Sequence, residues 1–423
     1  MIRAGLAQIE ITAAVGTPLT GYIARDGNAV GMHDPLMAKA LVLADGANQA
    51  AIVTCDLLGL HRRDVQRFRQ AIQAATGIPA DAVMIASSHT HAGPATLLLL
   101  ECGEVDHGYL ALLGEKLVAV SVAAQAQLRP ARFGVGHGRV TEGVHNRRKP
   151  GDVTDPDLGI LRVTDEHGQT MGVVLNYACH PTCLTGENRL FSAEYCGYAT
   201  DEIQRATGAT ALFITGAIGD VGPVARGWPV LEQLGERVAQ EALRLLPTIA
   251  TEEWNNVRVA TRTLDLPLQP LPTVGELEAE LARWRPGVPA AASTQVPPHP
   301  KVPVAMRQWA EQTLAQVRSG AGGGPVQSEV QAIRLGDLVL VSAPGELFVE
   351  LGLAVKQGAG APHVFIGGFG NDNIGYIPTR RAYPFGGYEV SEAYKYYGYP
   401  AALAPEAGEQ YVQEAVELCR SVA

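Results

Sequence analysis

Apolar runs of strand length alternate along this chain with segments whose apolar positions recur at a helical period. The runs at 38–44, 49–60 and 82–93 are apolar and strand-like, whereas residues 62–77 carry an amphipathic helical pattern. A strand, helix, strand order predicts βαβ units in which helices cover a sheet. The same alternation recurs at 171–246, so we predict an α/β fold with mixed β-sheets flanked by helices.

The pattern changes at about residue 256, where alternating strands begin and a helix-like segment follows at 275–285. A Pro-rich stretch and a Gly-rich break then frame one further helix, as in an inserted excursion. We predict a single domain over 1–423, with a main α/β half at 1–250, a second half at 251–423, and a Pro/Gly-rich excursion at about 285–325 that is mobile or forms a lid.

The composition and charge narrow the classes of partner. Hydrophobic residues make up 47% of the 423 residues and charged residues 18%, as in ordinary globular proteins. The formal net charge of −10 means that no global field attracts nucleic acid or anionic lipid. We therefore expect a small-molecule or lipid-like substrate and no nucleic acid, and homo-oligomerisation stays open.

Targeting and redox features favour the cytoplasm, although the visible N-terminus does not exclude secretion. The N-terminus lacks the basic and apolar regions of a secretory signal, and no run of about 18 apolar residues predicts a transmembrane segment. The cysteines form no CxxC pairs, so reduced thiols are the simplest interpretation. The six are Cys55, Cys102, Cys179, Cys183, Cys196 and Cys419.

The strongest local motif, SSHTHAGP at 87–94, stands where an apolar strand runs into a Gly-Pro turn. Residues two apart in an extended segment face the same side, so His89 and His91 can address one site. They could form a ligand pair, or one ligand and one proton-handling group. The alternative is that both histidines cap a loop through hydrogen bonds, because so short a motif is common.

A second apolar strand ends in NYACHPT, which carries His180. Imidazole suits zinc, and Cys179 and Cys183 could add thiolates. Small buried hydrophobes are the commoner role for such cysteines, and we favour that interpretation. The case for His180 as a ligand depends on its meeting His89 in space.

Further strand ends carry other candidate groups. Glu346 follows an apolar strand and precedes a helix, where a carboxylate is a metal ligand, a general base or a helix N-terminal charge. A turn-rich loop then carries Tyr376 and leads to Tyr388, although tyrosines in loops usually pack. Asp220 lies on a Gly-rich turn that lacks the Lys and Ser/Thr of a phosphate-binding loop. The joint occurrence of these groups at strand ends indicates one shared site.

The ordered set of motifs resembles the neutral/alkaline (non-lysosomal) ceramidase family. HTHxGP is followed by HPT, a Gly-Asp-Val turn, PGE, and GYIPT with a tyrosine-rich stretch behind it. The opening GLAQIEITAAVGTPLTGY and the HNRR segment also match, so the resemblance covers nearly the whole chain. It implies the α/β catalytic domain of that family, in a divergent short member without the C-terminal immunoglobulin-like domain.

The resemblance implies one zinc ion per chain and a set of supporting residues. The implied zinc ligands are His89, His180, Glu346 and Tyr376. His91 would be an acid/base or oxyanion group, Arg147 would contact a substrate carbonyl or hydroxyl, and Tyr388 would be a further oxyanion donor. Two neutral imidazoles and a carboxylate agree with this assignment, because they leave zinc a net positive charge and an open position for water.

Asp56 and Asp220 stand at other predicted strand ends. They could orient the ligand histidines through hydrogen bonds or hold a second metal. Orienting the histidines, or a purely structural role, is the simpler interpretation for both.

We therefore predict a zinc-dependent hydrolase that cleaves an amide (N-acyl) bond with metal-activated water. Ceramidases carry a serine directly after the Gly-Asp-Val triplet, and this chain has Gly222 there, which excludes an acyl-serine at that position. A substrate smaller than ceramide is thus at least as plausible. The alternatives are an esterase or lactonase with the same zinc site, a non-catalytic binding protein for lipids or small ligands, and, more weakly, a two-metal phosphoesterase.

Overall fold

The computed structural model describes residues 1–149, 151–285 and 299–422, which form three main β-sheets. The first sheet has the order β5-β4-β3-β1-β6, with β1 (Arg3–Glu10), β3 (Met37–Ala44), β4 (Gln49–Cys55), β5 (Val83–Ser87) and β6 (Arg129–Pro130). The second has the order β12-β10-β9-β7, with β7 (Arg132–Arg139), β9 (Asp157–Thr164), β10 (Thr170–Tyr177) and β12 (Thr210–Thr215). The third has the order β14-β15-β16-β18, with β14 (Val257–Leu266), β15 (Val326–Leu335), β16 (Leu338–Ala343) and β18 (His363–Gly368).

Short paired strands tie the loops together. They are β2 (Gly31–Met32) with β11 (Leu190–Phe191), β8 (Val144–Asn146) with β13 (Val221–Pro223), and β17 (Glu346–Leu347) with β19 (Tyr376–Ile377). The last two pairs matter for the site, because β8/β13 joins the loops that follow β7 and β12 of the second sheet, and β17/β19 joins the loops that follow β16 and β18 of the third.

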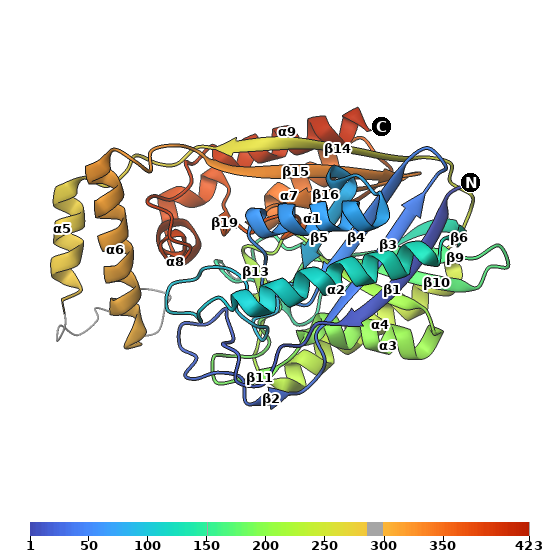
Figure 1. Ribbon diagram of the computed structural model, residues 1–423, viewed down its shortest axis with the longest axis horizontal. Helices are drawn as coiled ribbons and strands as arrows, with labels where there is room; N and C mark the ends of the chain where they lie inside the picture. The colour runs from blue at the N-terminus through green and yellow to red at the C-terminus, as the bar shows by residue number, and fades with distance from the viewer. Residues whose placement is uncertain (150, 286–298, 423) are drawn as a thin grey trace.

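Helices cover the outer faces of the sheets, which confirms the predicted α/β fold of mixed sheets flanked by helices (Figure 1). On the first sheet lie α1 (Arg62–Thr76) and α2 (His107–Ala126), on the second α3 (Glu194–Thr207) and α4 (Trp228–Leu245), and on the third α7 (Val349–Gly358) and α9 (Ala407–Ser421). A short helix, α8 (Ala393–Tyr396), belongs to the tyrosine-rich stretch.

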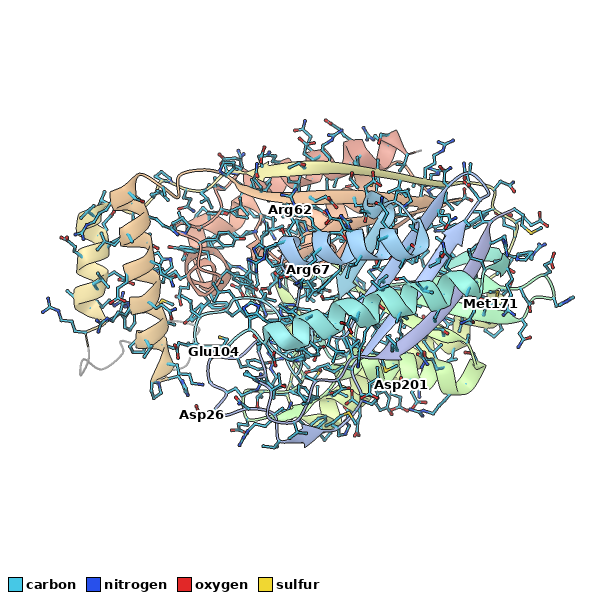
Figure 2. The ribbon with its side chains drawn as sticks, viewed as in Figure 1. Asp26, Arg62, Arg67, Glu104, Met171 and Asp201 are labelled. Carbon is cyan, nitrogen blue, oxygen red and sulfur yellow. The ribbon has the colours of Figure 1, made fainter. Side chains whose placement is uncertain are left out.

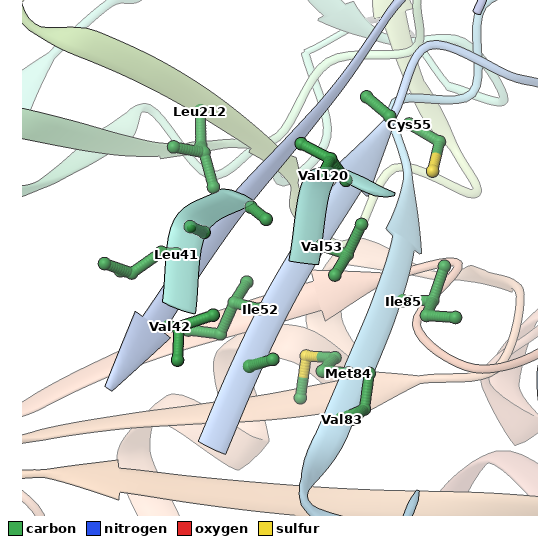
Figure 3. Packing of buried hydrophobic residues seen from close by; sticks show 14 of the residues in the cluster. Leu41, Val42, Ile52, Val53, Cys55, Val83, Met84, Ile85, Val120 and Leu212 are labelled. Carbon is green, nitrogen blue, oxygen red and sulfur yellow. The ribbon is translucent and has the colours of Figure 1, made fainter. Parts of the chain in front are cut away.

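The five-stranded sheet is buried on both faces. Val120 from α2 and Leu212 from β12 belong to one apolar cluster with Leu41 of the sheet (Figure 3). Leu340 and Phe365, from the second half of the chain, belong to the same cluster. One apolar cluster therefore contains residues of both predicted halves, and a second lies almost wholly within the second half.

Three βαβ units position the candidate site. The pairs β4/β5, β10/β12 and β16/β18 each run parallel, and α1, α3 and α7 respectively connect them. The helix α1 follows the predicted pattern, because Phe68 and Ile72 are buried on one face and Gly77, at φ 76°, ends it. Since parallel strands present ligands at their carboxyl ends, loops from the three units can meet in one place.

Helical structure stands on both sides of the segment 286–298, before and within the predicted excursion at about 285–325. The helix predicted at 275–285 is α5 (Val274–Arg283), and the further helix is α6 (Lys301–Ser319). The two pack against each other at one end of the molecule (Figure 1). Residues 286–298 lie outside the described residues, so the lid stays a prediction.

Among the described residues, α2 is long and apolar enough to cross a membrane, by length and composition alone. The criterion of about 18 uninterrupted apolar residues does not select this helix, because Glu115 and Lys116 break the run. Tyr109, Leu113 and Leu117 are buried on the side of α2 that packs against β1 and β3.

Candidate metal centre

Three histidines from two strand ends converge in the interior. His89 and His91 follow β5, and His180 follows β10. The Nε2 atom of His89 lies 3.1 Å from Nε2 of His180 and 3.2 Å from Nε2 of His91. All three nitrogens belong to a cluster whose donor atoms lie within 4.8 Å of one another, which is compact enough to hold a metal ion.

Backbone carbonyls select the tautomers of His89 and His91. Nδ1 of His89 lies 2.6 Å from the Leu58 carbonyl oxygen, and Nδ1 of His91 lies 3.0 Å from that of Gly21. Because a carbonyl only accepts, each of these Nδ1 atoms carries the proton and each Nε2 presents a lone pair. Nδ1 of His180 lies 3.3 Å from the Ile218 carbonyl oxygen and 3.4 Å from Nη1 of Arg147, so an acceptor and a donor compete for it. The three Nε2 atoms face one another, an arrangement that a shared cation stabilises.

Glu346 completes this arrangement with an unpartnered carboxylate oxygen. Its Oε1 accepts a hydrogen bond from Tyr397 Oη at 2.7 Å, but its buried Oε2 has no partner in the part of the chain that is described. Oε2 lies 3.7 Å from Nε2 of His89 and 3.5 Å from Nε2 of His180.

The separations between these donor atoms fit a zinc ion. A tetrahedral ion with bonds of about 2.0–2.1 Å holds its ligand atoms about 3.3 Å apart. The three atoms of His89, His180 and Glu346 are separated by 3.1–3.7 Å. Two imidazoles and one carboxylate are also a ligand set that catalytic zinc sites use.

Backbone pairing between two turns holds Glu346 at the site. The Glu346 N–H donates to the Gly375 carbonyl at 2.8 Å, and Glu346 pairs with Tyr376 in the β17/β19 ladder. A Cβ atom on Gly345 would lie 2.3 Å from the Gly375 oxygen, so only glycine permits this approach. The PGE motif and the GYI motif are therefore locked together.

Arg147 links the phenol of Tyr376 to the second sheet. Its Nη2 donates to Tyr376 Oη at 2.7 Å and to the Gly219 carbonyl at 2.8 Å, and its Nε lies 3.2 Å from Glu389 Oε1. The ring of Tyr388 meets that of Tyr376 edge to face, with centroids 5.8 Å apart. Tyr376 and Tyr388 line a small cavity that His89 and His91 also line.

Comparison with known proteins decides the family. The N-terminal region of neutral/alkaline non-lysosomal ceramidases matches residues 3–233, more than half of the chain. The chain belongs to this ceramidase family. The predicted resemblance is therefore confirmed.

Relatives of this ceramidase-family chain are distant in sequence. The neutral ceramidase of Pseudomonas aeruginosa is 24% identical over 92% of this chain and 68% of its own length. That of Mycobacterium tuberculosis is 24% identical over 49% of this chain and 36% of its own length. A ceramidase structure in complex with C2 superposes with a TM-score of 0.79 at 22% identity, over 99% of this chain and 75% of that one. The crystal structure of the P. aeruginosa enzyme gives 0.76 at 22% identity, over 99% and 74% of the two chains. Both solved structures share the fold of this chain.

Burial sets the protonation of the candidate ligands. It lowers the pKa of His89 to about 3, against the opposing effect of the Leu58 carbonyl, and puts the pKa values of His91 and His180 well below their usual value. Burial also raises the pKa of Glu346 to about 7, although Arg147 opposes that shift. At neutral pH the imidazoles are thus neutral and ready to bind a metal.

The structure engages Asp56 and Asp220 elsewhere. Oδ2 of Asp56 accepts from the Met37 N–H at 2.9 Å, and burial raises the pKa of this carboxyl to about 6. Asp220 accepts from the Val349 N–H at 2.8 Å and from Asn146 Nδ2 at 2.9 Å. Both carboxylates therefore fix loops beside the site, and neither belongs to the histidine cluster.

Sequence reasoning missed several groups that shape the site. Buried Arg25 donates to the carbonyls of Thr20, His91 and Asn188 at 2.6–2.8 Å, and it thereby ties three loops together. Tyr397 and Glu389, which hold Glu346 and Arg147, were also missed. The tyrosine-rich stretch was a sequence signal that could have pointed to Tyr397. Arg25 lies in an ordinary polar loop, where no sequence signal distinguishes it.

Proposed function

We propose that the chain is a zinc-dependent hydrolase that cleaves the amide bond of an N-acyl substrate. The observation that carries this proposal is that Nε2 of His89 and Nε2 of His180 lie 3.7 Å and 3.5 Å from the unpartnered Oε2 of Glu346, with Nε2 of His91 3.2 Å from that of His89. Membership in the ceramidase family and the names of its relatives supply the reaction class.

His89, His180 and Glu346 would hold the zinc, with Tyr376 as a fourth, exchangeable ligand. Bound zinc would supply a water of lowered pKa and a Lewis acid for the substrate carbonyl. Tyr376 suits exchange, because its oxygen already accepts a hydrogen bond from Arg147. Burial raises the pKa of this phenol and the Arg147 charge opposes that rise, so metal and guanidinium together would favour the phenolate.

His91 is placed to move the proton of the reaction. In hydrolysis the oxygen of water bonds to the carbonyl carbon, the C–N bond breaks, and the nitrogen leaves with a proton. Nε2 of His91 lies 3.2 Å from His89 Nε2 and lines the cavity, where it can take a proton from water and pass it to the amine. Arg147 and Tyr388 would stabilise the negative charge on the former carbonyl oxygen.

Gly222 is consistent with water as the only nucleophile. The residue has no side chain, and a Cβ placed there would meet Cβ of His180 at 3.7 Å and Cδ of Arg147 at 4.0 Å. The position therefore borders the centre and has room for a side chain, yet it carries no hydroxyl that could form an acyl-enzyme.

The test combines metal content with hydrolysis in matched variants. Zinc is measured by plasma mass spectrometry on wild type, His89→Ala, His180→Ala and His91→Ala, with exposed His167→Ala as the control. We expect about one zinc per chain in wild type and control, and loss of zinc from the His89 and His180 variants.

The His91→Ala variant tests whether His91 is a zinc ligand or a proton carrier. It should keep zinc while its hydrolysis of N-acyl amides falls by about 10²–10⁴-fold. A wild-type protein that binds no zinc after reconstitution would refute the proposal. Loss of zinc from His91→Ala would instead make His91 a ligand.

A further inference from the structure

A buried glutamate on the tyrosine-rich stretch pairs with both arginines of the HNRR segment. Glu389 belongs to a π-helical turn, η4 (Tyr388–Glu392), that leads into α8, and its side chain is 4% exposed. Oε2 of Glu389 accepts a hydrogen bond from Nη1 of Arg148 at 2.7 Å, and Oε1 lies 3.2 Å from Nε of Arg147. Figure 2 shows side chains filling the space between α8 and α6, and these two helices are in contact. The stretch that carries Glu389 is therefore packed in place.

Arg148 fixes the orientation of the Glu389 carboxylate. While its Nη1 donates to Oε2 of Glu389, its Nη2 donates to the Gly386 carbonyl at 2.6 Å. Gly387, which directly precedes η4, has a φ of 96°, a conformation that favours glycine. One arginine thus holds both the turn before η4 and one oxygen of the carboxylate. The other carboxylate oxygen is left to face Arg147.

Glu389 is the counter-ion of a cation that stands beside the proposed metal centre. The buried Nε of Arg147 has no hydrogen-bond partner among the described residues, so the ion pair with Glu389 compensates its charge. Nη2 of Arg147 donates to Tyr376 Oη at 2.7 Å and to the Gly219 carbonyl at 2.8 Å. The guanidinium is therefore held between a carboxylate on one edge and a phenol on the other.

Two carboxylates compete for this one guanidinium. Burial lowers the pKa of Arg147, but Tyr376 and the carboxylates of both Glu389 and Glu346 outweigh burial and raise it. Among the described residues, Arg147 forms its ion pair with Glu389 and none with Glu346. Glu346 lies beside two histidines instead, and its Oε2 keeps no hydrogen bond. A buried cation that loses its counter-ion is drawn to the next negative charge, which for Arg147 is Glu346.

We propose that Glu389 is a positioning residue that holds Arg147 on the phenol of Tyr376. It thereby keeps the guanidinium away from Glu346 and leaves the free carboxylate oxygen to the metal. Glu389 is not among the described residues that line the small cavity at the histidines, so it acts through Arg147 rather than on a substrate. This inference rests on the proposed zinc site and adds a residue that keeps the site open to the ion.

The test is a double-mutant cycle on zinc affinity, measured by competition between the full chain and a chelator for Zn²⁺. The four proteins are wild type, Glu389→Gln, Arg147→Gln and the variant with both changes. Glutamine keeps the shape of glutamate and removes its charge, so Glu389→Gln should weaken zinc binding by about 10–100-fold. The double variant should bind zinc as tightly as Arg147→Gln alone, because no cation is left to approach Glu346.

Glu329→Gln is the matched control. It also removes the counter-ion of a buried arginine, since Glu329 Oε1 lies 2.8 Å from Nη1 of Arg69. That pair joins β15 to α1, and neither residue lines the small cavity at the histidines. The control should lose stability as any broken buried ion pair does, while its zinc affinity stays at the wild-type value.

A conservative variant serves if Glu389→Gln does not fold. Glu389→Asp keeps the negative charge and withdraws it by one methylene group. Its zinc affinity should fall by a smaller factor than that of Glu389→Gln, and Arg147→Gln in the same chain should again abolish the difference.

The cycle separates a positioning role from a structural one. An equal loss of zinc affinity from the Glu389 variant with and without Arg147→Gln would overturn the inference, as would unchanged affinity in Glu389→Gln; either result leaves the proposed function intact. Zinc binding without hydrolysis of any N-acyl amide would refute the proposed reaction alone, because the cycle needs no turnover. A wild-type protein that binds no zinc would refute the proposed function and the inference together.

Discussion

A methyl group added at Gly345 should displace Glu346 from the metal centre. The new Cβ would lie 2.3 Å from the Gly375 carbonyl oxygen. Reaching ordinary contact requires the two turns to separate by about 1 Å. The Glu346 N–H donates to that same oxygen at 2.8 Å, so the separation also breaks the hydrogen bond that positions the carboxylate.

The size of the effect follows from these contacts. A lost buried hydrogen bond destabilises by about 1–3 kcal/mol, and overpacking adds about 1–3 kcal/mol. With an unfolding entropy of about 2 cal/mol/K per residue over 423 residues, a total of about 2–6 kcal/mol lowers Tm by roughly 2–7 °C. A ligand moved by about 1 Å lies far outside the tolerance of about 0.2 Å for metal bonds, so zinc affinity should fall at least about 10–100-fold.

Gly222→Ala is the matched control for Gly345→Ala. Both glycines lie beside the centre, but a Cβ at Gly222 meets its nearest atom at 3.7 Å, which is ordinary contact. Differential scanning calorimetry and zinc titration on both variants should show loss of Tm and zinc affinity for Gly345→Ala and wild-type values for Gly222→Ala. Wild-type Tm and zinc affinity in Gly345→Ala would refute the reasoning.

Two further predictions concern residues away from the ligand set. Arg25→Met leaves three carbonyls without their donor, so urea denaturation should show a loss of about 3–5 kcal/mol; an unchanged midpoint would mean that water replaces the guanidinium. Burial raises the pKa of Glu194 to about 7 from a value of 4.5, so the folded state resists the ionisation that the unfolded chain undergoes from pH 4.5 upward. The wild type should therefore lose up to about 3 kcal/mol relative to Glu194→Gln between pH 4.5 and pH 7, and parallel stability curves for the two proteins would contradict this.

Periodicity predicted the elements that have one polar face. The helix α1 was predicted because buried Phe68 and Ile72 alternate with exposed polar positions. The helix α2 was not predicted, because its exposed side also carries apolar residues such as Leu112 and Val122. A helix without a polar face gives no period to detect, although its buried side packs on the five-stranded sheet as firmly as an amphipathic helix would.

Position at a strand end predicted where the chemistry gathers. His89, His180 and Glu346 were singled out because each follows an apolar strand, and the structure brings them together. The groups that orient these side chains were beyond prediction from sequence. The carbonyls of Leu58 and Gly21 select the tautomers of His89 and His91, but every residue carries a backbone carbonyl, so the sequence does not show which ones are used.

Hydrogen bonds between the loops that carry the candidate ligands hold the donor atoms in position. Thr215 Oγ1 donates to the Ser88 carbonyl at 2.8 Å, which joins the end of β12 to the loop that carries His89. The His180 N–H donates to the Val221 carbonyl at 3.1 Å. Because each ligand-bearing loop is hydrogen-bonded to another loop, the ligand atoms keep their separations through backbone contacts. A metal ion that enters such a centre meets lone pairs already in place, and the ordering entropy of its ligands is borne by folding rather than by metal binding.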